Sequence, residues 1–408
     1  MSDSAPQNPS QTPRRAIPPA SLSAFGPADS VITVSPQAVV ANWQYLDSLS
    51  RPETDTAAVI KANGYGLGAT RLAPHLAAAG CKTFFVMSLA EALSLRAALS
   101  RHDDHETSEI LVLGGCHSGQ EDDFTAHDIT PVINSAEQLE RLAASGRVRQ
   151  QPVPAALHVD TGMTRLGLDA DETAWLVSRL ADGRDAFDGL KPRLLMSHLR
   201  AAEDLSDPAN AAQHAAFSQL AGQFPDLPSS LANSGGTLQG PAYHFQMTRP
   251  GIALYGLHPA GAGMDGPQVA QAASLAPTIR WDARILQIRA ARAGDAVGYN
   301  GTHVLTRDSR VATIGVGYAD GYQRRLGNRA HVMIGGTSAP VIGRISMDSI
   351  TVDVTDIAAA TLEQADCATV LGPGYDLARM AQDADTIGYE ILTRLGQRPG
   401  WRYLPADG

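Results

Sequence analysis

The sequence predicts an α/β protein in which a (β/α)8 barrel of the TIM type is followed by a C-terminal all-β domain. Up to about residue 270, short apolar runs alternate with longer stretches rich in alanine and leucine, and beyond it the helix-like stretches disappear. Such runs are typical of parallel strands that helices cover on both faces. Eight of these units fit a closed barrel of about 220 residues. A doubly wound open sheet stays open as an alternative, because periodicity alone does not exclude it.

The strands and helices of this first domain are predicted from two different periods. Each strand is a short, mostly apolar run, and these runs are residues 57–62, 83–87, 109–113, 129–133, 155–159, 193–197, 230–233 and 247–254. Each helix repeats apolar residues three or four positions apart, and these stretches are residues 70–79, 89–99, 136–144, 173–180 and 210–224. The barrel is therefore expected to span residues 29–270.

Short β-branched runs, separated by glycine, asparagine or aspartate turns, follow the barrel. They are residues 283–289, 311–316, 331–334, 339–342 and 349–354. This pattern predicts an all-β domain over residues 271–408. The Pro/Ser-rich residues 1–28 are expected to form a solvated, disordered tail.

The composition narrows the partners of the protein. A formal net charge of −10 argues against nucleic acid or an anionic membrane as a general partner, so any phosphate site must be local. The three cysteines are scattered and indicate neither disulfides nor a metal site, as expected for reduced thiols in the cytoplasm. No run approaches the roughly 20 apolar residues of a membrane span, and the stretch after Arg14-Arg15 is too short for an export signal.

Residues 57–68 end a run of small apolar residues on Lys61 and then place three glycines and Tyr65 in the next seven positions. Lysine is rarely buried unless a group pairs or reacts with it, so this pattern indicates a reactive amine beside a bound anion. Other polar residues follow later strands in the same way, namely Asp160, Arg165, His198 and residues 233–236. Because the carboxyl ends of the strands carry the chemistry of a barrel, these residues form one candidate site.

Residues 61–66, Lys-Ala-Asn-Gly-Tyr-Gly, resemble the cofactor-lysine motif of the alanine racemases, which are fold-type III pyridoxal-phosphate enzymes. The resemblance runs from about residue 30 to residue 403. Its further markers are residues 159–167 (VDTGMTRLG), Asn233-Ser234, residues 249–252 (RPGI), Tyr299, residues 317–322 (GYADGY) and residues 343–348 (GRISMD). The ordered set is much more specific than the lysine motif alone.

The resemblance implies a site for pyridoxal 5′-phosphate and a two-base mechanism. Lys61 is expected to form the Schiff base, and Arg249 to face the pyridine nitrogen, which a guanidinium keeps unprotonated because it can only donate. The implied phosphate contacts are Tyr65, Ser234, Gly251, Ile252 and Tyr389. Lys61 and Tyr299 would exchange protons on opposite faces of the substrate, and His198 would link Tyr299 to Arg249.

Tyr299 lies in the second domain and Lys61 in the barrel, and in the family these residues meet across the interface of a homodimer. Each site would therefore be shared between two subunits. Arg165 and the backbone of Met347 are expected to bind the substrate carboxylate, and Asp348 is expected to hold the loop of Met347.

One position departs from the family. Many members carry a lysine there that reacts with CO2 to form a carbamate facing the substrate arginine, whereas this chain has His158. Imidazole forms no such stable carbamate and is mostly uncharged at neutral pH. Arg165 must therefore be held by another anion, such as chloride, or by a neutral acceptor.

The resemblance therefore implies a cytoplasmic enzyme that interconverts L- and D-alanine and so supplies D-alanine for peptidoglycan. Tyr318 and Tyr322 resemble the family's narrow entrance, which favours small side chains. Three alternatives stay open. A racemase of broader specificity would have a wider entrance, a non-enzymatic pyridoxal-phosphate carrier would resemble the barrel alone, and a decarboxylase would release CO2 and lack the ordered motifs.

Overall fold

The computed structural model describes residues 17–101, 108–181, 187–261, 264 and 266–405. Within these ranges the chain forms two compact units. The larger unit combines residues 36–275 with residues 385–395, and the smaller combines residues 17–35, 276–384 and 396–404. No helix in these ranges is long and apolar enough to cross a membrane.

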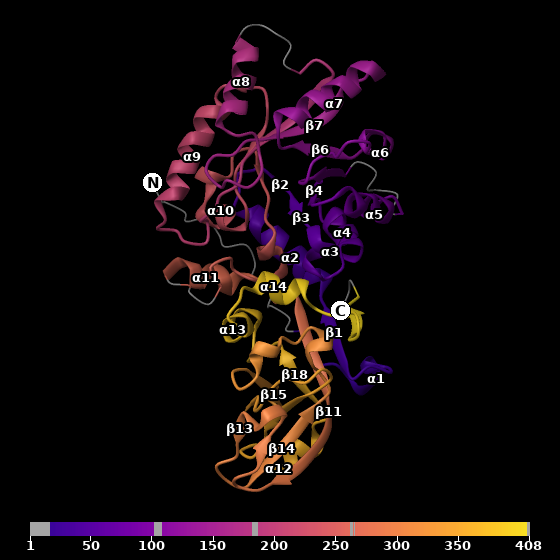
Figure 1. Cartoon of the computed structure of the whole chain (residues 1–408), viewed down its shortest axis with the longest axis vertical. Helices are drawn as coiled ribbons and strands as arrows, with labels where there is room; N and C mark the ends of the chain where they lie inside the picture. The colour runs from indigo at the N-terminus through magenta and orange to yellow at the C-terminus, as the bar shows by residue number, and fades with distance from the viewer. Residues whose placement is uncertain (1–16, 102–107, 182–186, 262–263, 265, 406–408) are drawn as a thin grey trace, which may run out of the picture. The chain divides into compact units, whose positions relative to one another are not determined.

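The larger unit is a barrel of parallel strands (Figure 1). Seven strands pair in parallel and in chain order, and they are β3 (Ala58–Val59), β4 (Thr83–Val86), β5 (Glu109–Val112), β6 (Thr130–Ile133), β7 (Val153–His158), β8 (Leu190–Met196) and β9 (Ser229–Ser230). Next, β10 (Met247–Thr248) pairs in parallel with β2 (Asp55–Thr56), which directly precedes β3. On the other side, Arg249 N donates to Ala232 O, just beyond β9, at 2.8 Å. These bonds close the ring, so the predicted barrel is confirmed and the open sheet is excluded.

The larger unit contains helices, most of which connect its strands, as predicted, and lie around them in Figure 1. They are α2 (Pro36–Ser48), α3 (Lys61–Tyr65), α4 (Ala69–Ala78), α5 (Leu89–Leu99), α6 (Glu121–Ala126), α7 (Ala136–Arg149), α8 (Ala170–Ala181), α9 (Pro208–Ala221), α10 (Ser234–Gln239), α11 (Gly266–Ser274) and α14 (Gly388–Thr393), with the 3₁₀ helices η1 (Pro241–Tyr243) and η2 (Ile252–Tyr255). The predicted strand over residues 247–254 is wrong beyond residue 248, because Pro250 cannot donate to a ladder and η2 begins soon after it.

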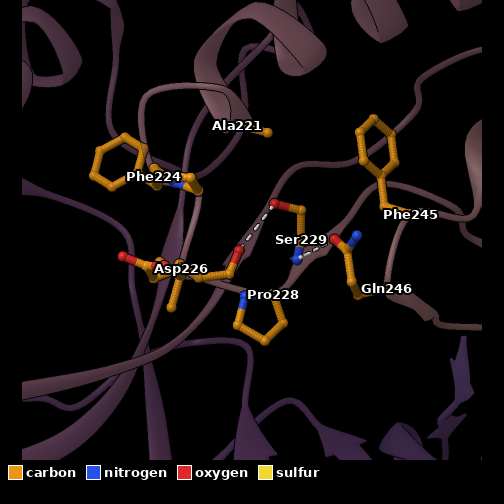
Figure 2. Close-up of a pocket in the computed structure, with 9 residues that line it drawn as sticks. Ala221, Phe224, Asp226, Pro228, Ser229, Phe245 and Gln246 are labelled. Atoms are coloured by element: carbon orange, nitrogen blue, oxygen red, sulfur yellow. Dashed lines mark hydrogen bonds between the residues drawn. The ribbon is translucent and has the colours of Figure 1, made fainter. Parts of the chain in front are cut away.

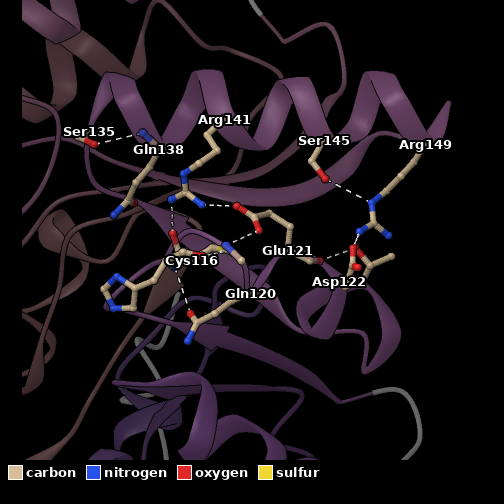
Figure 3. Close-up of polar contacts among 12 residues, drawn as sticks. Cys116, Gln120, Glu121, Asp122, Ser135, Gln138, Arg141, Ser145 and Arg149 are labelled. Carbon is tan, nitrogen blue, oxygen red and sulfur yellow. Dashed lines mark hydrogen bonds and ion pairs between the residues drawn. The ribbon is translucent and has the colours of Figure 1, made fainter.

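Ion pairs hold α6 against α7 (Figure 3). Arg141 of α7 pairs with Glu121 of α6 and donates to the carbonyl of Cys116 at 2.5 Å. Arg149, at the end of α7, pairs with Asp122. Because both side chains of the Arg141–Glu121 pair are mostly buried, water screens this pair less than an exposed one, and it fixes the short α6 beside its longer neighbour.

The smaller unit is built mainly on an eight-stranded sheet. Six strands lie in the order β16 (Thr337–Pro340), β15 (His331–Ile334), β18 (Cys367–Leu371), β11 (Ile279–Ala291), β1 (Ser30–Val34) and β19 (Gly400–Tyr403), while β14 (Ser309–Ile314) pairs with β11 and β17 (Ile350–Asp353). The other elements are α1 (Leu22–Phe25), β12 (Ala296–Val297), η4 (Tyr299–Gly301), β13 (His303–Val304), η5 (Tyr318–Asp320), η6 (Arg324–Leu326), α12 (Ala359–Gln364) and α13 (Leu377–Asp383). The sequence does not predict α12 and α13, so this unit is mostly rather than wholly β.

Residues 17–35 belong to this β-rich unit, which corrects two expectations. Residues 17–28 are not a solvated tail, because Ile17, Ala20 and Phe25 are buried and Ala20 N donates to Asp282 Oδ2 at 3.0 Å. Residues 29–35 are not part of the barrel, since β1 pairs with β11 and β19. Residues 385–395, expected in the second domain, belong to the barrel unit. Residues 1–16 lie outside the described ranges.

Candidate active site

Five of the predicted site residues follow barrel strands. They are Lys61 after β3, Arg165 on the loop after β7, His198 after β8, Ser234 after β9 and Arg249 after β10. The carboxyl ends of the strands meet at one face of a closed parallel barrel. Electrostatic interactions join Lys61 to Arg165, and His198 to Lys61, Arg165 and Arg249. The structure therefore brings these residues into one site.

Lys61 is the one lysine of the chain that lies at the carboxyl ends of the barrel strands. The chain has only three lysines, and the other two, Lys82 and Lys191, are exposed at the beginnings of β4 and β8. The beginnings of the strands lie at the opposite end of the barrel. Any chemistry at the carboxyl face that needs a lysine amine therefore depends on Lys61.

A left-handed turn of the backbone follows Lys61. Residues 62–64 have φ of 52°, 54° and 64° with ψ of 46°, 48° and 46°, and Tyr65 has φ of 53°. In L-residues other than glycine this conformation costs roughly 1–2 kcal/mol each, so the surroundings must hold it. Asn63 Oδ1 accepts from Ala69 N at 3.1 Å, and a Cβ on Gly64 would lie 3.0 Å from the same nitrogen. The asparagine and the glycine of the motif thus serve this turn.

The surroundings of Lys61 favour its neutral amine. Burial lowers the pKa of Lys61, and the positive charge of Arg165 lowers it further, while the carboxylate of Glu91 opposes both. Only the neutral form of an amine is nucleophilic. Burial at this position therefore prepares Lys61 to react with a carbonyl group.

Hydroxyl donors gather near the N-terminus of η2. Ser234 Oγ accepts from Gly251 N at 2.8 Å and from Ala253 N at 3.2 Å, which leaves its own proton available to donate. A Cβ on Gly251 would lie only 2.3 Å from the Tyr65 hydroxyl. Neither the Tyr65 nor the Tyr389 hydroxyl donates to a group among the described residues, and burial raises the pKa of both phenols, so they stay protonated. Donors of this kind suit a phosphate.

Arg249 is buried and forms no ion pair with any residue that the structure describes. It is 3% exposed, donates to Ser197 O at 2.6 Å and to Ser230 Oγ, and lies 5.9 Å from the centre of the Phe85 ring. Burial lowers the pKa of Arg249 to about 9, which leaves the guanidinium charged at neutral pH. A fixed cation that can only donate suits the residue expected to face a pyridine nitrogen.

His158 is neutral and has a defined tautomer. Asn134 Nδ2 donates to two backbone carbonyls at 2.9 and 3.1 Å, so its Oδ1 must accept the proton of His158 Nδ1 at 2.7 Å. Burial, with the charges of Arg249 and Arg165, lowers the pKa of His158 to about 4. His158 Nε2 is therefore left as an uncharged acceptor.

His198 is held in a similar way. Asn233 Oδ1 accepts from Gly236 N at 3.0 Å, which directs Asn233 Nδ2 to the carbonyl of Leu199 at 3.1 Å and to His198 Nε2 at 3.4 Å. Burial and the charge of Arg249 lower the pKa of His198 well below its ordinary value. Both histidines of the site are thus neutral at pH 7.

The loop that carries Arg165 is shaped by Asp160. Its carboxylate accepts from the amides of Gly162, Met163 and Thr164 at 2.8, 2.7 and 2.8 Å. Burial raises the pKa of Asp160, but these backbone bonds outweigh that effect and lower it overall. Arg165 itself is exposed and has no hydrogen bond or ion pair within the described part of the chain. Its guanidinium is therefore open to a carboxylate ligand.

The β-rich unit exposes the other predicted site residues. Tyr299 is 68% exposed and Met347 is 53% exposed, and within the described residues neither the Tyr299 hydroxyl nor the Met347 amide makes a hydrogen bond. Tyr318 is also exposed. Tyr322 is 1% exposed and packs with its ring centre 6.1 Å from that of Trp281. The expectation that Tyr322 lines an entrance is therefore wrong.

Sequence reasoning missed Arg398, which supports the loop of Met347. Arg398 pairs with both oxygens of the buried Asp320 at 2.6 and 2.7 Å. It also donates to Asp348 Oδ1 at 2.5 Å and to Met347 O at 3.3 Å. Asp348 is thus one of two carboxylates through which Arg398 fixes this loop. No local pattern indicates this link, because Arg398 lies 78 positions after Asp320.

A separate hollow of about 330 Å³ lies at the amino end of β9 (Figure 2). Its lining includes the end of α9, the beginning of β9, Phe245 and Gln246. Ser229 N donates to Gln246 Oε1 at 3.0 Å on its wall. None of the predicted site residues lines it, so it is not the candidate active site.

The fold and the site define an enzyme of the barrel class that presents a lysine amine, hydroxyl donors and a buried arginine at the carboxyl ends of its strands. Residues 34–259 match the family model of the alanine racemase N-terminal domain, and residues 278–403 match that of the alanine racemase C-terminal domain. The chain belongs to the alanine racemase family.

Known relatives are similar over nearly the whole chain. An alanine racemase of Acidiphilium cryptum is 46% identical over 367 residues, which are 90% of this chain and 96% of the relative. The crystal structure of an alanine racemase from Bartonella henselae with covalently bound pyridoxal phosphate is 37% identical, has a TM-score of 0.84, and matches 93% of this chain and 100% of its own. The biosynthetic alanine racemase of Pseudomonas aeruginosa is 32% identical, with a TM-score of 0.80 over 93% and 100% of the two chains.

Proposed function

We propose that this enzyme interconverts L- and D-alanine with pyridoxal 5′-phosphate bound to Lys61. The observation that carries the proposal is the position of Lys61, the only lysine at the carboxyl face, where it is half-buried and has a lowered pKa, together with hydroxyl donors at the same face that suit a phosphate. The family match and the covalently bound cofactor of the Bartonella henselae relative support the same assignment.

The residues present fit the cofactor. Tyr65, Ser234 and Tyr389 offer hydroxyl donors to its phosphate, close to Gly251 and Ile252 at the beginning of η2. A side chain at position 251 would collide with the Tyr65 hydroxyl, which explains the glycine. A phosphate placed there needs no lysine or arginine, because oriented neutral donors suffice.

Arg249 would donate to the pyridine nitrogen from its fixed, buried position. When bound, the cofactor withdraws electrons from Cα of the amino acid and so makes its proton more acidic. Because Arg249 only donates, it would keep the ring nitrogen unprotonated and this withdrawal moderate. Moderate withdrawal favours rapid return of the proton to Cα over side reactions such as transamination.

Two groups would move protons on opposite faces of Cα. The Lys61 amine, free once substrate has taken its place, would act on one face, and the partner subunit's Tyr299 would act on the other. The enzyme would therefore be a homodimer with shared sites. The 68% exposure of Tyr299 supports this role, since its phenol is open to a second copy. His198 would connect the phenol with Arg249, as the resemblance implies.

Arg165 and the Met347 amide would bind the substrate carboxylate. Arg165 is free of other partners among the described residues, and an arginine fork can bond both carboxylate oxygens. His158 stands where many family members carry the carbamate, but no hydrogen bond joins it to Arg165, so its neutral imidazole leaves the guanidinium without a protein acceptor among the described residues. A neutral imidazole does not offset the charge of the guanidinium as an anionic carbamate would, so Arg165 attracts the substrate carboxylate more strongly than it would beside a carbamate.

The biological role that we propose is the supply of D-alanine for peptidoglycan in the cytoplasm. The family resemblance supports this role. Cys81, Cys116 and Cys367 are free thiols, which supports a reducing compartment.

Activity and the attachment of the cofactor can be tested together. Purified protein should convert either enantiomer of alanine to the racemate without releasing CO2. Borohydride reduction and peptide mapping should find a pyridoxyl group on Lys61, and Lys61→Ala should lose both the yellow colour and turnover, whereas Lys191→Ala should keep both. A reducible, coloured adduct in Lys61→Ala would refute the assignment. Assays with serine and lysine beside alanine separate a specific racemase from a broader one.

A further inference from the structure

Glu91 connects the beginning of α5 to the turn that follows Lys61. Glu91 Oε1 accepts from Ala62 N at 2.7 Å, and its Oε2 accepts from Met87 N at 2.7 Å and from Ser88 N at 3.4 Å. One carboxylate thus joins the chain beyond β3 to the chain beyond β4. We propose that Glu91 is a positioning residue that holds the left-handed turn behind Lys61 and keeps a negative charge beside its amine.

Among residues 62–64 of the turn, Ala62 is the one that most needs an external support. Its φ of 52° and ψ of 46° lie in the left-handed region, and its methyl group has no polar atom that could stabilise this conformation. Asn63 has its own side-chain bond to Ala69 N, and Gly64 has no Cβ to strain. The Ala62 N–H bonds to no group other than Glu91 among the described residues. Glu91 therefore holds the weakest point of the turn.

A helix cap alone does not explain this geometry. In a capping box the glutamate reaches back to the amide of the N-cap residue, which here is Ser88. The Glu91–Ser88 bond is the longest of the three, at 3.4 Å, whereas the bonds to Ala62 and Met87 are 2.7 Å. The carboxylate is thus directed mainly to the strand ends, and capping is its weaker role.

The charge of Glu91 also reaches the lysine. Three charged or titratable groups interact with the Lys61 amine, namely Glu91 on α5, Arg165 on the loop after β7 and His198 after β8. Glu91 raises the pKa of Lys61, while burial and Arg165 lower it. Removal of this charge should therefore lower the pKa of Lys61, a change that the loss of a helix cap alone would not cause.

The small number of lysines gives a direct measurement of this change. In a Lys82→Arg, Lys191→Arg background Lys61 is the only lysine left, so reductive methylation of the cofactor-free full chain with carbon-13 formaldehyde labels one lysine. The NMR shift of that label against pH gives the titration midpoint of Lys61. We expect the midpoint to fall in Glu91→Gln. We expect no change in Ser88→Ala, which weakens the same capping box but keeps the carboxylate.

Glu91→Ala tests the support of the turn. Its affinity for pyridoxal phosphate, measured by equilibrium dialysis, should fall at least about tenfold, while that of Ser88→Ala should stay within about twofold. The melting temperatures of both variants show how much of each change in affinity comes from the loss of the helix cap of α5. An unchanged Lys61 midpoint in Glu91→Gln, or undiminished cofactor affinity in Glu91→Ala, would overturn the inference.

The inference rests on the proposed role of Lys61, but the two fail in different ways. A wrong role for Lys61 would appear as a pyridoxyl group on another residue after borohydride reduction. The titration midpoint is measured without cofactor or turnover, so it tests the effect of Glu91 in either case.

Discussion

Replacement of His158 by asparagine should make the barrel less sensitive to mild acid. His158 is buried, and its pKa is about 4 in the folded protein compared with 6.5 for an ordinary histidine. A base with a lowered folded pKa binds its proton more readily in the unfolded chain. Stability from neutral His158 is therefore fully present above the unfolded pKa and is lost as the pH falls toward the folded one. Asparagine can still donate to Asn134 but cannot titrate.

The size of the effect follows from the two pKa values. At about pH 5 the unfolded chain has bound this proton almost completely and the folded chain hardly at all. The difference corresponds to about 1.5 pKa units, or about 2 kcal/mol. Between about pH 7 and about pH 5, His158→Asn should thus lose about 2 kcal/mol less of its unfolding free energy than the wild type does. Any loss of stability that the substitution causes equally at both pH values does not affect the result, because only the change in unfolding free energy between the two pH values is compared.

Urea unfolding of the cofactor-free protein, followed by the helical circular dichroism signal, measures this difference. Among the described residues most helices belong to the unit that contains His158, so the signal reports that unit. Asn134→Ala is the matched control, since it removes the partner of His158 Nδ1 but leaves an imidazole that can titrate. Equal losses in wild type and His158→Asn would refute the reasoning, because they would show that His158 is not held neutral.

Three further predictions concern the site and its supports. Added bicarbonate should not change initial rates, because residue 158 is not a lysine that could form a carbamate, and a clear activation would contradict this. Tyr299→Phe should keep the cofactor bound but slow exchange of the Cα proton with deuterated solvent at least about a hundredfold in one direction, and undiminished exchange would remove Tyr299 from the mechanism. Arg398→Met should lower the free energy of unfolding by about 2–3 kcal/mol, which is less than the loss of a fully buried pair would cost because Arg398 is half-exposed. It should also raise the KM for alanine, because Arg398 no longer holds the loop of Met347. An unchanged KM in that destabilised variant would separate Arg398 from substrate binding.

Local patterns explain which parts of the fold could be predicted. Helix α5 has the bounds that its apolar period predicts, and the structure adds a capping box of Ser88 and Glu91 at its beginning. The sequence does not reveal where residues 17–28 and residues 29–35 belong, because their partners are remote in sequence: Ala20 bonds to Asp282, 262 positions away. A short apolar segment gives no sign of such a partner. The same limit applies to β1, whose five residues are all buried against strands from the other end of the chain.

In the candidate site, too, some residues could be located from the sequence and others could not. The residues that a motif and a strand end could locate are Lys61, Arg165, His198, Ser234 and Arg249. Glu91 and Asn134 could not be located, because each acts on a neighbouring strand end through a side-chain bond that no spacing records. Only the resemblance indicates Tyr299, since an exposed tyrosine in a short 3₁₀ helix has no local mark of a catalytic role.

The arrangement of charges shows how a chain with a net charge of −10 can attract anions to this face. The two acids that interact with its basic groups are committed to the backbone, because Asp160 bonds three amides of its own loop and Glu91 bonds Ala62 and Met87. The guanidinium groups of Arg165 and Arg249 form no ion pairs within the described residues, and the lowered pKa values of His158 and His198 keep both imidazoles neutral. The face therefore keeps the positive charge of two guanidinium groups available for an anionic ligand such as a carboxylate. A carbamate at position 158 would neutralise part of this charge, so a neutral histidine there leaves Arg165 with a stronger attraction for the substrate.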